Sequence, residues 1–171
     1  MQQMITYGNT AAKRAGIKKE VLHKPIITEL FKPVNIIIIA SSYKENTEEK
    51  IDYWGVVNNI KLHPFDFKSC DYPSQRFCLT YKINNSYLNE FEVGPKNIMY
   101  IFLLEHKYEY AFVKKLDVFN WFNQYKPKLY PGKYDNSNYF EFPTNEIEKL
   151  AKIKSYKNCK EYLNLLNEGS N

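Results

Sequence analysis

The sequence predicts a mixed α/β or α+β domain in which a central mixed β-sheet is flanked by helices. Two observations lead to this class. Short runs rich in Ile, Val, Phe and Tyr, bounded by polar or Pro-containing segments, are typical of strands. Helix-forming segments precede and follow these runs, and such helices bury their apolar faces on the sheet that the strands form.

The length of the chain indicates one domain. A chain of 171 residues can close one sizeable hydrophobic core, whereas smaller pieces would bury too little surface to be stable alone. We therefore expect residues 1–171 to form a single domain. The hydrophobic content of 44% and the aromatic content of 16% exclude a disordered chain.

The N-terminal half predicts a helix, a strand and a hairpin. Residues 9–31 have helix-forming composition, although Pro25 should kink or split the helix. Residues 34–40, "VNIIIIA", are short and β-branched, which predicts a buried strand. Residues 51–57 and 61–68 should pair around an Asn-Asn turn, because Asn tolerates the left-handed conformation of tight turns.

The C-terminal half is less uniform. Residues 75–91 are ambiguous between helix and loop, and residues 97–116 predict a second hairpin followed by an aromatic helix at 116–125. Residues 126–143 are rich in Pro, Gly and Asn and predict a loop. Residues 144–167 carry an apolar stripe at helical spacing and predict a C-terminal helix.

Charge and cysteine content indicate the kinds of partner and the redox compartment that suit the protein. A formal charge of +5 gives a mild attraction for polyanions. Three Cys without a C-x-x-C pair fit a reducing compartment and make a zinc site an unfavoured interpretation. Neither a signal peptide nor a membrane span is recognisable, so we expect a cytoplasmic protein with no membrane partner.

The candidate chemistry lies in "IDYWGVVNNIKLHPFDFKSC", residues 51–70. Because side chains alternate along a strand, a two-residue turn in a regular hairpin would place Asp52 and Asp66 on opposite faces. A three-residue loop, or a bulge near Pro64, would instead bring Asp52 across from Asp66, with Lys68 on the same face. A common site therefore requires an irregular hairpin; otherwise these residues are ordinary surface charges.

Two facing carboxylates repel each other unless a cation lies between them. Mg²⁺ takes hard oxygen ligands and often binds through one or two carboxylates and a substrate phosphate. A neighbouring Lys can orient or activate the attacking water and neutralise the phosphate charge. Asp52, Asp66 and Lys68 thus have the residue types that phosphodiester hydrolysis needs, with Mg²⁺ as the cofactor and Mn²⁺ as its substitute.

The pattern "KIDYWGVV...FDFKS" resembles the core of the PD-(D/E)xK nuclease superfamily, and is most similar to RecU-type Holliday-junction resolvases. The resemblance covers roughly residues 50–122 and implies a restriction-endonuclease-like core. It implies that Asp52 and Asp66 bind the metal, that the Phe67 carbonyl completes the site, and that Lys68 serves the water.

The same resemblance implies a further Glu from the first helix. Glu20 is the first choice and Glu29 the second. The chain also departs from the family pattern, because Ile51 stands where Pro is expected and the second acid is Asp rather than Glu. No "HQ" pair follows the Lys, where the resolvases place a helix.

Basic residues offer two candidate DNA contacts. Cations on the first helix would gain free energy by counterion release, and Lys residues interleaved with Tyr after residue 125 could bind unpaired strands. A solvated helix and a loop held by its aromatic residues explain the two groups as well. The candidates are Lys13, Arg14, Lys18, Lys19, Lys126, Lys128 and Lys133.

The predicted function is a Mg²⁺-dependent DNA endonuclease acting on branched or replicative DNA. We expect a homodimer, because two coordinated cuts need two sites. The alternatives are a restriction-type sequence-specific endonuclease and a non-catalytic DNA-binding protein with a nuclease-like fold.

Overall fold

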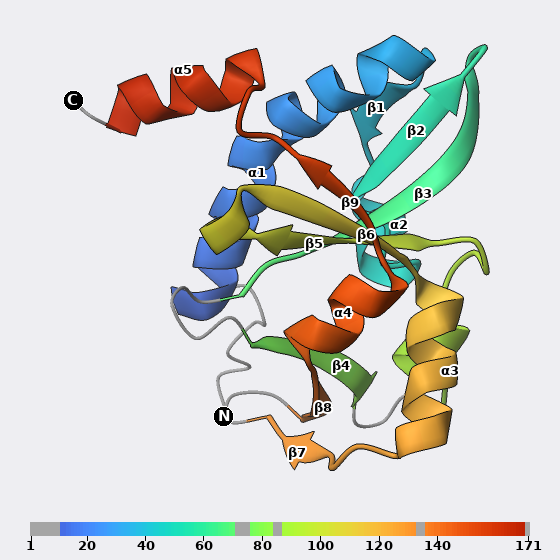
Figure 1. Cartoon of the computed structure of the whole chain (residues 1–171). Coiled ribbons are helices and arrows are strands. Elements are labelled where there is room, and N and C mark those ends of the chain that lie inside the picture. Colours follow the sequence, from blue (N-terminus) through green and yellow to red (C-terminus); the bar gives the residue numbers. More distant parts are fainter. Residues whose placement is uncertain (1–10, 71–75, 84–86, 133–135, 170–171) are drawn as a thin grey trace, which may run out of the picture.

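The computed structural model describes residues 11–70, 76–83, 87–132 and 136–169. Within these residues a six-stranded mixed sheet has the order β1-β2-β3-β5-β6-β9, and a separate three-stranded sheet has the order β4-β8-β7 (Figure 1). In the central sheet only β3 and β5 run parallel, and their connection passes through β4. The mixed α/β class with a central mixed sheet flanked by helices is confirmed.

The strands are β1 Ile37–Ala40, β2 Tyr53–Val57, β3 Ile60–Lys68, β4 Phe77–Ile83, β5 Met99–Leu104, β6 Glu109–Lys114, β7 Tyr130–Pro131, β8 Ser137–Phe142 and β9 Lys152–Ser155. The helices are α1 Ala11–Phe31, α2 Tyr43–Glu48, α3 Lys115–Tyr125, α4 Thr144–Leu150 and α5 Lys160–Gly169. Three 3₁₀ turns are η1 Lys32–Val34, η2 Glu90–Glu92 and η3 Glu105–Lys107.

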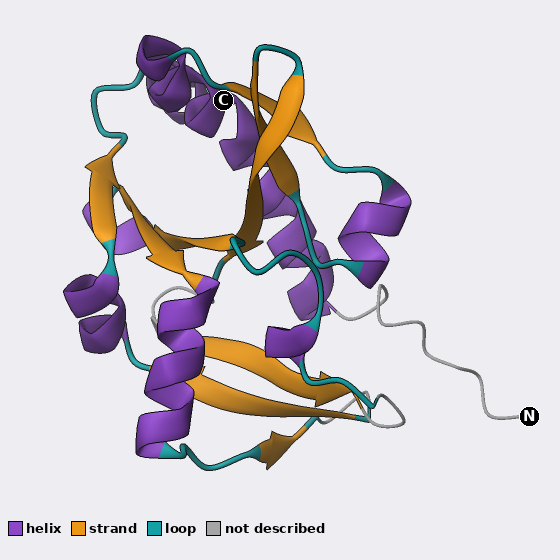
Figure 2. Cartoon of the chain, turned by 90° about the vertical axis from the view of Figure 1, so that its right-hand side faces the viewer, coloured by secondary structure: helices purple, strands orange, loops and turns teal. Residues whose placement is uncertain are grey.

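The central sheet is covered on both faces. One face packs its Phe, Tyr and Ile side chains against α1 and α5. The other face packs against α3, α4 and the small sheet, which lies below the central sheet in Figure 2. Strand β5 shows the alternation: Ile101 and Leu103 join the first cluster, whereas Tyr100, Phe102 and Leu104 join the second.

Several predicted elements are confirmed. Both hairpins form, and the aromatic helix at 116–125 is α3. The strand predicted at 34–40 is present as the shorter β1, but the prediction that it is buried is wrong, because β1 lies at the edge of the sheet and buries only Ile38. The expected split at Pro25 is wrong, because α1 continues through it as one helix, and a kink there stays a prediction.

The predictions for residues 75–91 and 126–143 need correction. The first segment contains β4, in which buried Phe77 and Leu79 alternate with more exposed neighbours. The segment predicted as a loop contains β7 and β8, and β8 buries Phe140 and Phe142 against the central sheet. In both cases the period of two was present in the sequence but was obscured by polar residues.

The predicted C-terminal helix at 144–167 is divided into α4, β9 and α5. Strand β9 pairs with β6, whose outer edge would otherwise leave backbone groups without partners. Tyr156, directly after β9, is 3% exposed and fills the apolar cluster beneath α1. Satisfying the sheet edge and burying Tyr156 therefore outweigh helix propensity here.

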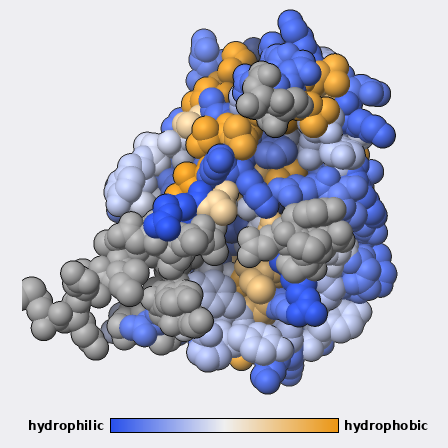
Figure 3. Space-filling model, turned by 90° about the vertical axis from the view of Figure 1, so that its left-hand side faces the viewer, coloured by the Kyte–Doolittle hydropathy of each residue, from blue (hydrophilic) through white to orange (hydrophobic). Residues whose placement is uncertain are grey.

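Apolar side chains also remain on the surface. They gather in the upper half of the face in Figure 3, on the side where α1 and α5 lie in Figure 1. The exposed residues of these two helices are Ile17, Val21, Leu22, Leu163 and Leu166. Within the described residues, no helix has the length and apolarity needed to cross a membrane.

Candidate active site

The register of the β2–β3 hairpin brings Asp52 to the face of Asp66. The turn is a two-residue one, with Asn58 and Asn59 at φ 50° and 64°. Tyr53 pairs with Phe65, so Asp52, one residue earlier, stands next to Asp66 on the same face. The two-residue turn alone would have separated them.

A bulge accounts for this register. Gly55 pairs with His63 but Val56 pairs with Lys61, so Leu62 is the extra residue in β3. The Leu62 carbonyl accepts a hydrogen bond from Asn97 Nδ2 at 3.2 Å, which satisfies a group that the ladder leaves out. A Cβ at Gly55 would lie 2.9 Å from His63 Cβ, so the bulge packs tightly only with glycine there.

Asp66 and Lys68 form an ion pair in a buried environment. The register of β3 with β5 pairs these residues with Tyr100 and Phe102, on the face covered by the small sheet. Lys68 Nζ lies 2.8 Å from Asp66 Oδ2 and 5.3 Å from the centre of the Tyr100 ring. Asp66 is 4% exposed, whereas the Lys68 side chain is 24% exposed and keeps contact with solvent.

Two donors hold the carboxylate of Asp52. Asn46 Nδ2 donates to Asp52 Oδ1 at 2.6 Å, and the Phe67 backbone N–H donates to Asp52 Oδ2 at 2.7 Å. The backbone of Asp52 is held by β3 and by the residue that follows β1. Its N–H donates to Phe65 O at 2.8 Å, and its carbonyl accepts from Ser41 N–H at 3.0 Å.

Helix α1 brings Glu20 to the same place. Gly16 lies against Ser69, where an added Cβ would be 3.7 Å from the hydroxyl oxygen. One turn later, Tyr53 OH donates to the Glu20 carbonyl at 2.6 Å. Since residues 16 and 20 share one helix face, the Glu20 side chain is directed to the end of β3.

The charges at this site interact strongly. Burial raises the pKa of Glu20, and Asp66 raises it further against the opposing effect of Lys68. Burial, followed by Asp66 and Glu20, holds the pKa of Asp52 well above its usual range. Burial alone would lower the pKa of Lys68, but Asp66, Tyr100 and Glu90 raise it overall. Lys68 is therefore an ammonium at neutral pH, and the carboxyl groups of Glu20, Asp52 and Asp66 are close enough to interact electrostatically.

Sequence reasoning missed three residues of this site. Glu90 in η2 is 9% exposed, and burial raises its pKa against the effect of Lys68. Lys115 is 3% exposed and donates from Nζ to the Val93 carbonyl at 3.1 Å. Asn46 lies on α2, in a polar segment for which the sequence predicted no helix or strand. The S-x-x-E capping box of Ser42 and Glu45 was the available signal for that helix.

The second-choice acid, Glu29, is not part of the site. It forms an ion pair with Lys32 and lies beside Leu30 and Cys159 under α5. Glu29 is more than two helical turns beyond Glu20, which places it along the apolar part of the sheet.

The predicted DNA contacts lie in different environments. Lys19 is engaged within the protein, because its Nζ lies 2.8 Å from both Glu105 Oε1 and the Cys70 carbonyl. Arg14 and Lys18 are exposed on α1. Lys128 Nζ lies 5.1 Å from the centre of the Tyr130 ring.

Two of these candidates are placed only in part or not at all. Lys133 lies outside the described residues, and only the backbone of Lys13 is described, in α1. Lys126 follows α3, whose 11 residues span roughly 16 Å from the end that carries Lys115. That length corresponds to about five nucleotides of a DNA strand, so Lys126 and Lys128 could contact only phosphates distant from the carboxylates.

The donor set suits a hard divalent cation held by few protein ligands. Asp66 Oδ2 is buried and, among the described residues, has no hydrogen-bond donor besides the ion pair with Lys68. No group of three or more His, Cys, Asp or Glu side chains that could hold a metal occurs in the described part of the chain. Mg²⁺ is compatible with this arrangement, because one or two carboxylates and substrate phosphate can suffice. The Phe67 carbonyl stays a predicted ligand.

Comparison with protein-family models, curated protein sequences and solved structures finds no match.

Proposed function

We propose that the protein is a Mg²⁺-dependent DNA endonuclease with its active site at Asp52, Asp66, Lys68 and Glu20. The observation that carries the proposal is the convergence of these four residues from three elements, made possible by a bulge that reverses the parity of the hairpin. Burying several carboxyl groups next to a lysine costs free energy, so a functional role is the natural explanation.

The residues divide into distinct roles. Asp52 and Asp66 would hold the cation, which supplies polarisation of the scissile phosphate and lowers the pKa of a bound water. Lys68 is protonated, so it would orient the attacking water and neutralise phosphate charge rather than remove a proton. Glu20, whose pKa is raised, suits the proton acceptor as water attacks phosphorus and the bond to the leaving oxygen breaks.

The resemblance to PD-(D/E)xK nucleases supports the same activity, with one structural departure. Where the resolvases place a helix after the Lys, this chain has β4 and η2 between β3 and β5. Buried Glu90 of η2 thereby enters the surroundings of Lys68. We propose that the substrate is branched DNA and that the active form is a homodimer. We also propose a restriction-endonuclease-like core and a cytoplasmic location.

The test is cleavage of a labelled four-way junction and of linear DNA in Mg²⁺, with Mn²⁺ as the substitute. Asp66→Asn and Lys68→Met should each lower the rate by at least about 10³-fold, because each removes charge stabilisation at the reacting phosphate. Asp117→Asn, on α3, and Lys152→Met, on β9, are the matched controls. Cleavage that survives both site substitutions would refute the proposal, and discrete fragments from linear DNA would favour the restriction-type alternative.

A non-catalytic DNA-binding protein is the second candidate. The observation that favours it is the absence of a three-residue metal-ligand group among the described residues. Tight, salt-sensitive DNA binding without cleavage in Mg²⁺ or Mn²⁺ would support this function over the nuclease. Sedimentation velocity of the native protein tests the proposed homodimer separately.

A further inference from the structure

We propose that Asn46 is a positioning residue that fixes the carboxylate of Asp52 for cation binding. The proposal rests on the proposed function of the site and assigns a task to α2, a helix that the nuclease resemblance does not include.

The first support is the geometry at Asp52. Asn46 approaches one carboxylate oxygen from α2, and the Phe67 N–H approaches the other from β3. Two donors from different elements fix both the rotation and the plane of the carboxylate. Because each carboxylate oxygen accepts more than one hydrogen bond, each keeps a lone pair for a cation. Partners of this kind orient ligating groups in metal sites.

The second support is the anchoring of α2. A helix of six residues is too short to be stable alone, so its position depends on contacts at its ends. Ser42 Oγ accepts from Glu45 N–H at 3.2 Å, and Glu45 Oε2 accepts from Ser42 N–H at 2.7 Å. The Glu45 carbonyl accepts from Ile51 N–H at 3.2 Å, which joins α2 to the residue before Asp52.

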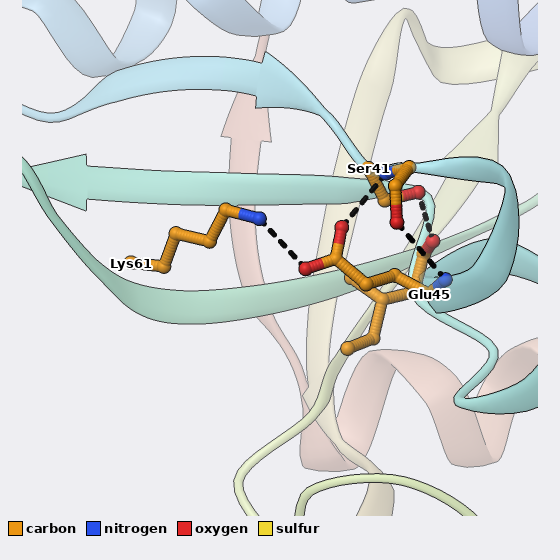
Figure 4. A network of polar contacts seen from close by, with 5 residues as sticks. Ser41, Glu45 and Lys61 are labelled. Atoms are coloured by element: carbon orange, nitrogen blue, oxygen red, sulfur yellow. Dashed lines mark hydrogen bonds and ion pairs between the residues drawn. The ribbon is translucent and has the colours of Figure 1, made fainter.

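The third support is the link between α2 and the bulge. Lys61 Nζ lies 2.7 Å from Glu45 Oε1, and Lys61 directly precedes the bulged Leu62 (Figure 4). The ion pair therefore ties the helix that carries Asn46 to the part of β3 that brings Asp66 opposite Asp52. The same polar network positions the Asp52 carboxylate and is tied to the bulge that determines the position of Asp66.

The experiment measures Mn²⁺ binding directly, from the electron paramagnetic resonance signal of the free ion, on native protein, Asn46→Ala and Thr47→Ala. Thr47 is the matched control, because its hydroxyl bonds to the Tyr43 carbonyl within α2 and not to Asp52. We expect Asn46→Ala to raise the Mn²⁺ dissociation constant by about 10-fold or more. Thr47→Ala should leave it unchanged.

Two further readouts separate positioning from folding. In Asn46→Ala, the Mg²⁺ concentration for half-maximal cleavage should rise with the dissociation constant, while the melting temperature stays close to native. Lys61→Met should weaken binding by at most about fivefold, because an exposed ion pair contributes little. A parallel fall in melting temperature and rate, with unchanged Mn²⁺ affinity, would assign Asn46 a structural role and overturn the proposal.

The outcomes also separate this proposal from the function on which it rests. If native protein binds Mn²⁺ and cleaves DNA, but Asn46→Ala binds equally well, the positioning role is wrong and the nuclease stands. If native protein neither binds Mn²⁺ nor cleaves DNA, both are wrong.

Discussion

The two faces of β3 bury side chains of opposite character. Phe65 and Phe67 enter the apolar cluster beneath α1. Asp66 enters the opposite face and is as deeply buried as they are, at 4% against 5% and 7% exposed, with Lys68 as its partner. One strand thus contributes core packing on one side and buried charge on the other.

This difference separates stability from function. Burying a Phe stabilises the fold by the hydrophobic effect, whereas an ion pair taken out of water often contributes little net stability. We therefore relate the charged face of β3 to the proposed function and its apolar face to folding. Substitutions on the two faces should affect different properties, and the predictions below begin with the largest effect.

Phe67→Ala should lower the free energy of unfolding by about 3–5 kcal/mol, because it removes a buried ring and leaves a cavity. Urea denaturation measures the change. Ile60→Ala, at the exposed tip of the same strand, is the control and should change stability by about 0.5 kcal/mol or less. A loss below 1 kcal/mol for Phe67→Ala would mean that this face is not the core.

His23, on the apolar side of the sheet, should make the stability of the folded protein decrease in acid. Burial, with a smaller effect of Lys19, lowers the pKa of His23 to about 4. The unfolded chain then binds more protons between about pH 6.5 and 4, so stability falls by about 3 kcal/mol as the pH drops through that range. His23→Phe should remove this slope in denaturation curves. An equal slope in native protein and variant would contradict the assignment.

Gly55→Ala should destabilise the protein by about 1–3 kcal/mol, because the new methyl group would collide with His63 and Ile36 at the bulge. It should also reduce cleavage, since the bulge sets the register that joins Asp52 to Asp66. Thermal melting and the junction assay measure the two effects. Unchanged activity would show that this register is not required.

Glu90 should have the smallest effect on stability, and its contribution should change with pH in the direction opposite to that of His23. Burial raises the pKa of Glu90, while Lys68, Lys50 and Lys115 oppose the rise. The folded state then binds more protons than the unfolded chain, so this contribution to stability is present at acid pH and is lost as the pH rises through the folded pKa. Glu90→Gln should make the denaturation free energy fall less steeply from pH 4 to 7, and a steeper fall would refute the interpretation.

The sequence predicts the parts of the fold whose periodicity is strong. The hairpin of β5 and β6 is a nearly continuous apolar run around a short polar break, and the Asn-Asn pair marks the turn between β2 and β3. Strand β9 was missed because its four residues also fit a helical stripe, and only the unpaired edge of β6 decides between the two.

The candidate site could be predicted from the sequence only on the condition that the β2–β3 hairpin is irregular. Alternation along the strands showed that Asp52 and Asp66 meet if the hairpin is irregular, but the bulge depends on Leu62, Asn97 and tight packing at Gly55. Contacts between distant segments determine such a feature, and no local pattern reports it. Asn46 and Glu90 were missed because both lie in segments without strong periodicity.

The most direct measurement is anomalous diffraction from crystals of the native protein soaked in Mn²⁺. We predict a single Mn²⁺ peak at bonding distance from carboxylate oxygens of both Asp52 and Asp66, lost in crystals of Asp66→Asn. A structure with no such peak, or with Mn²⁺ bound only elsewhere, would contradict the metal-dependent nuclease site.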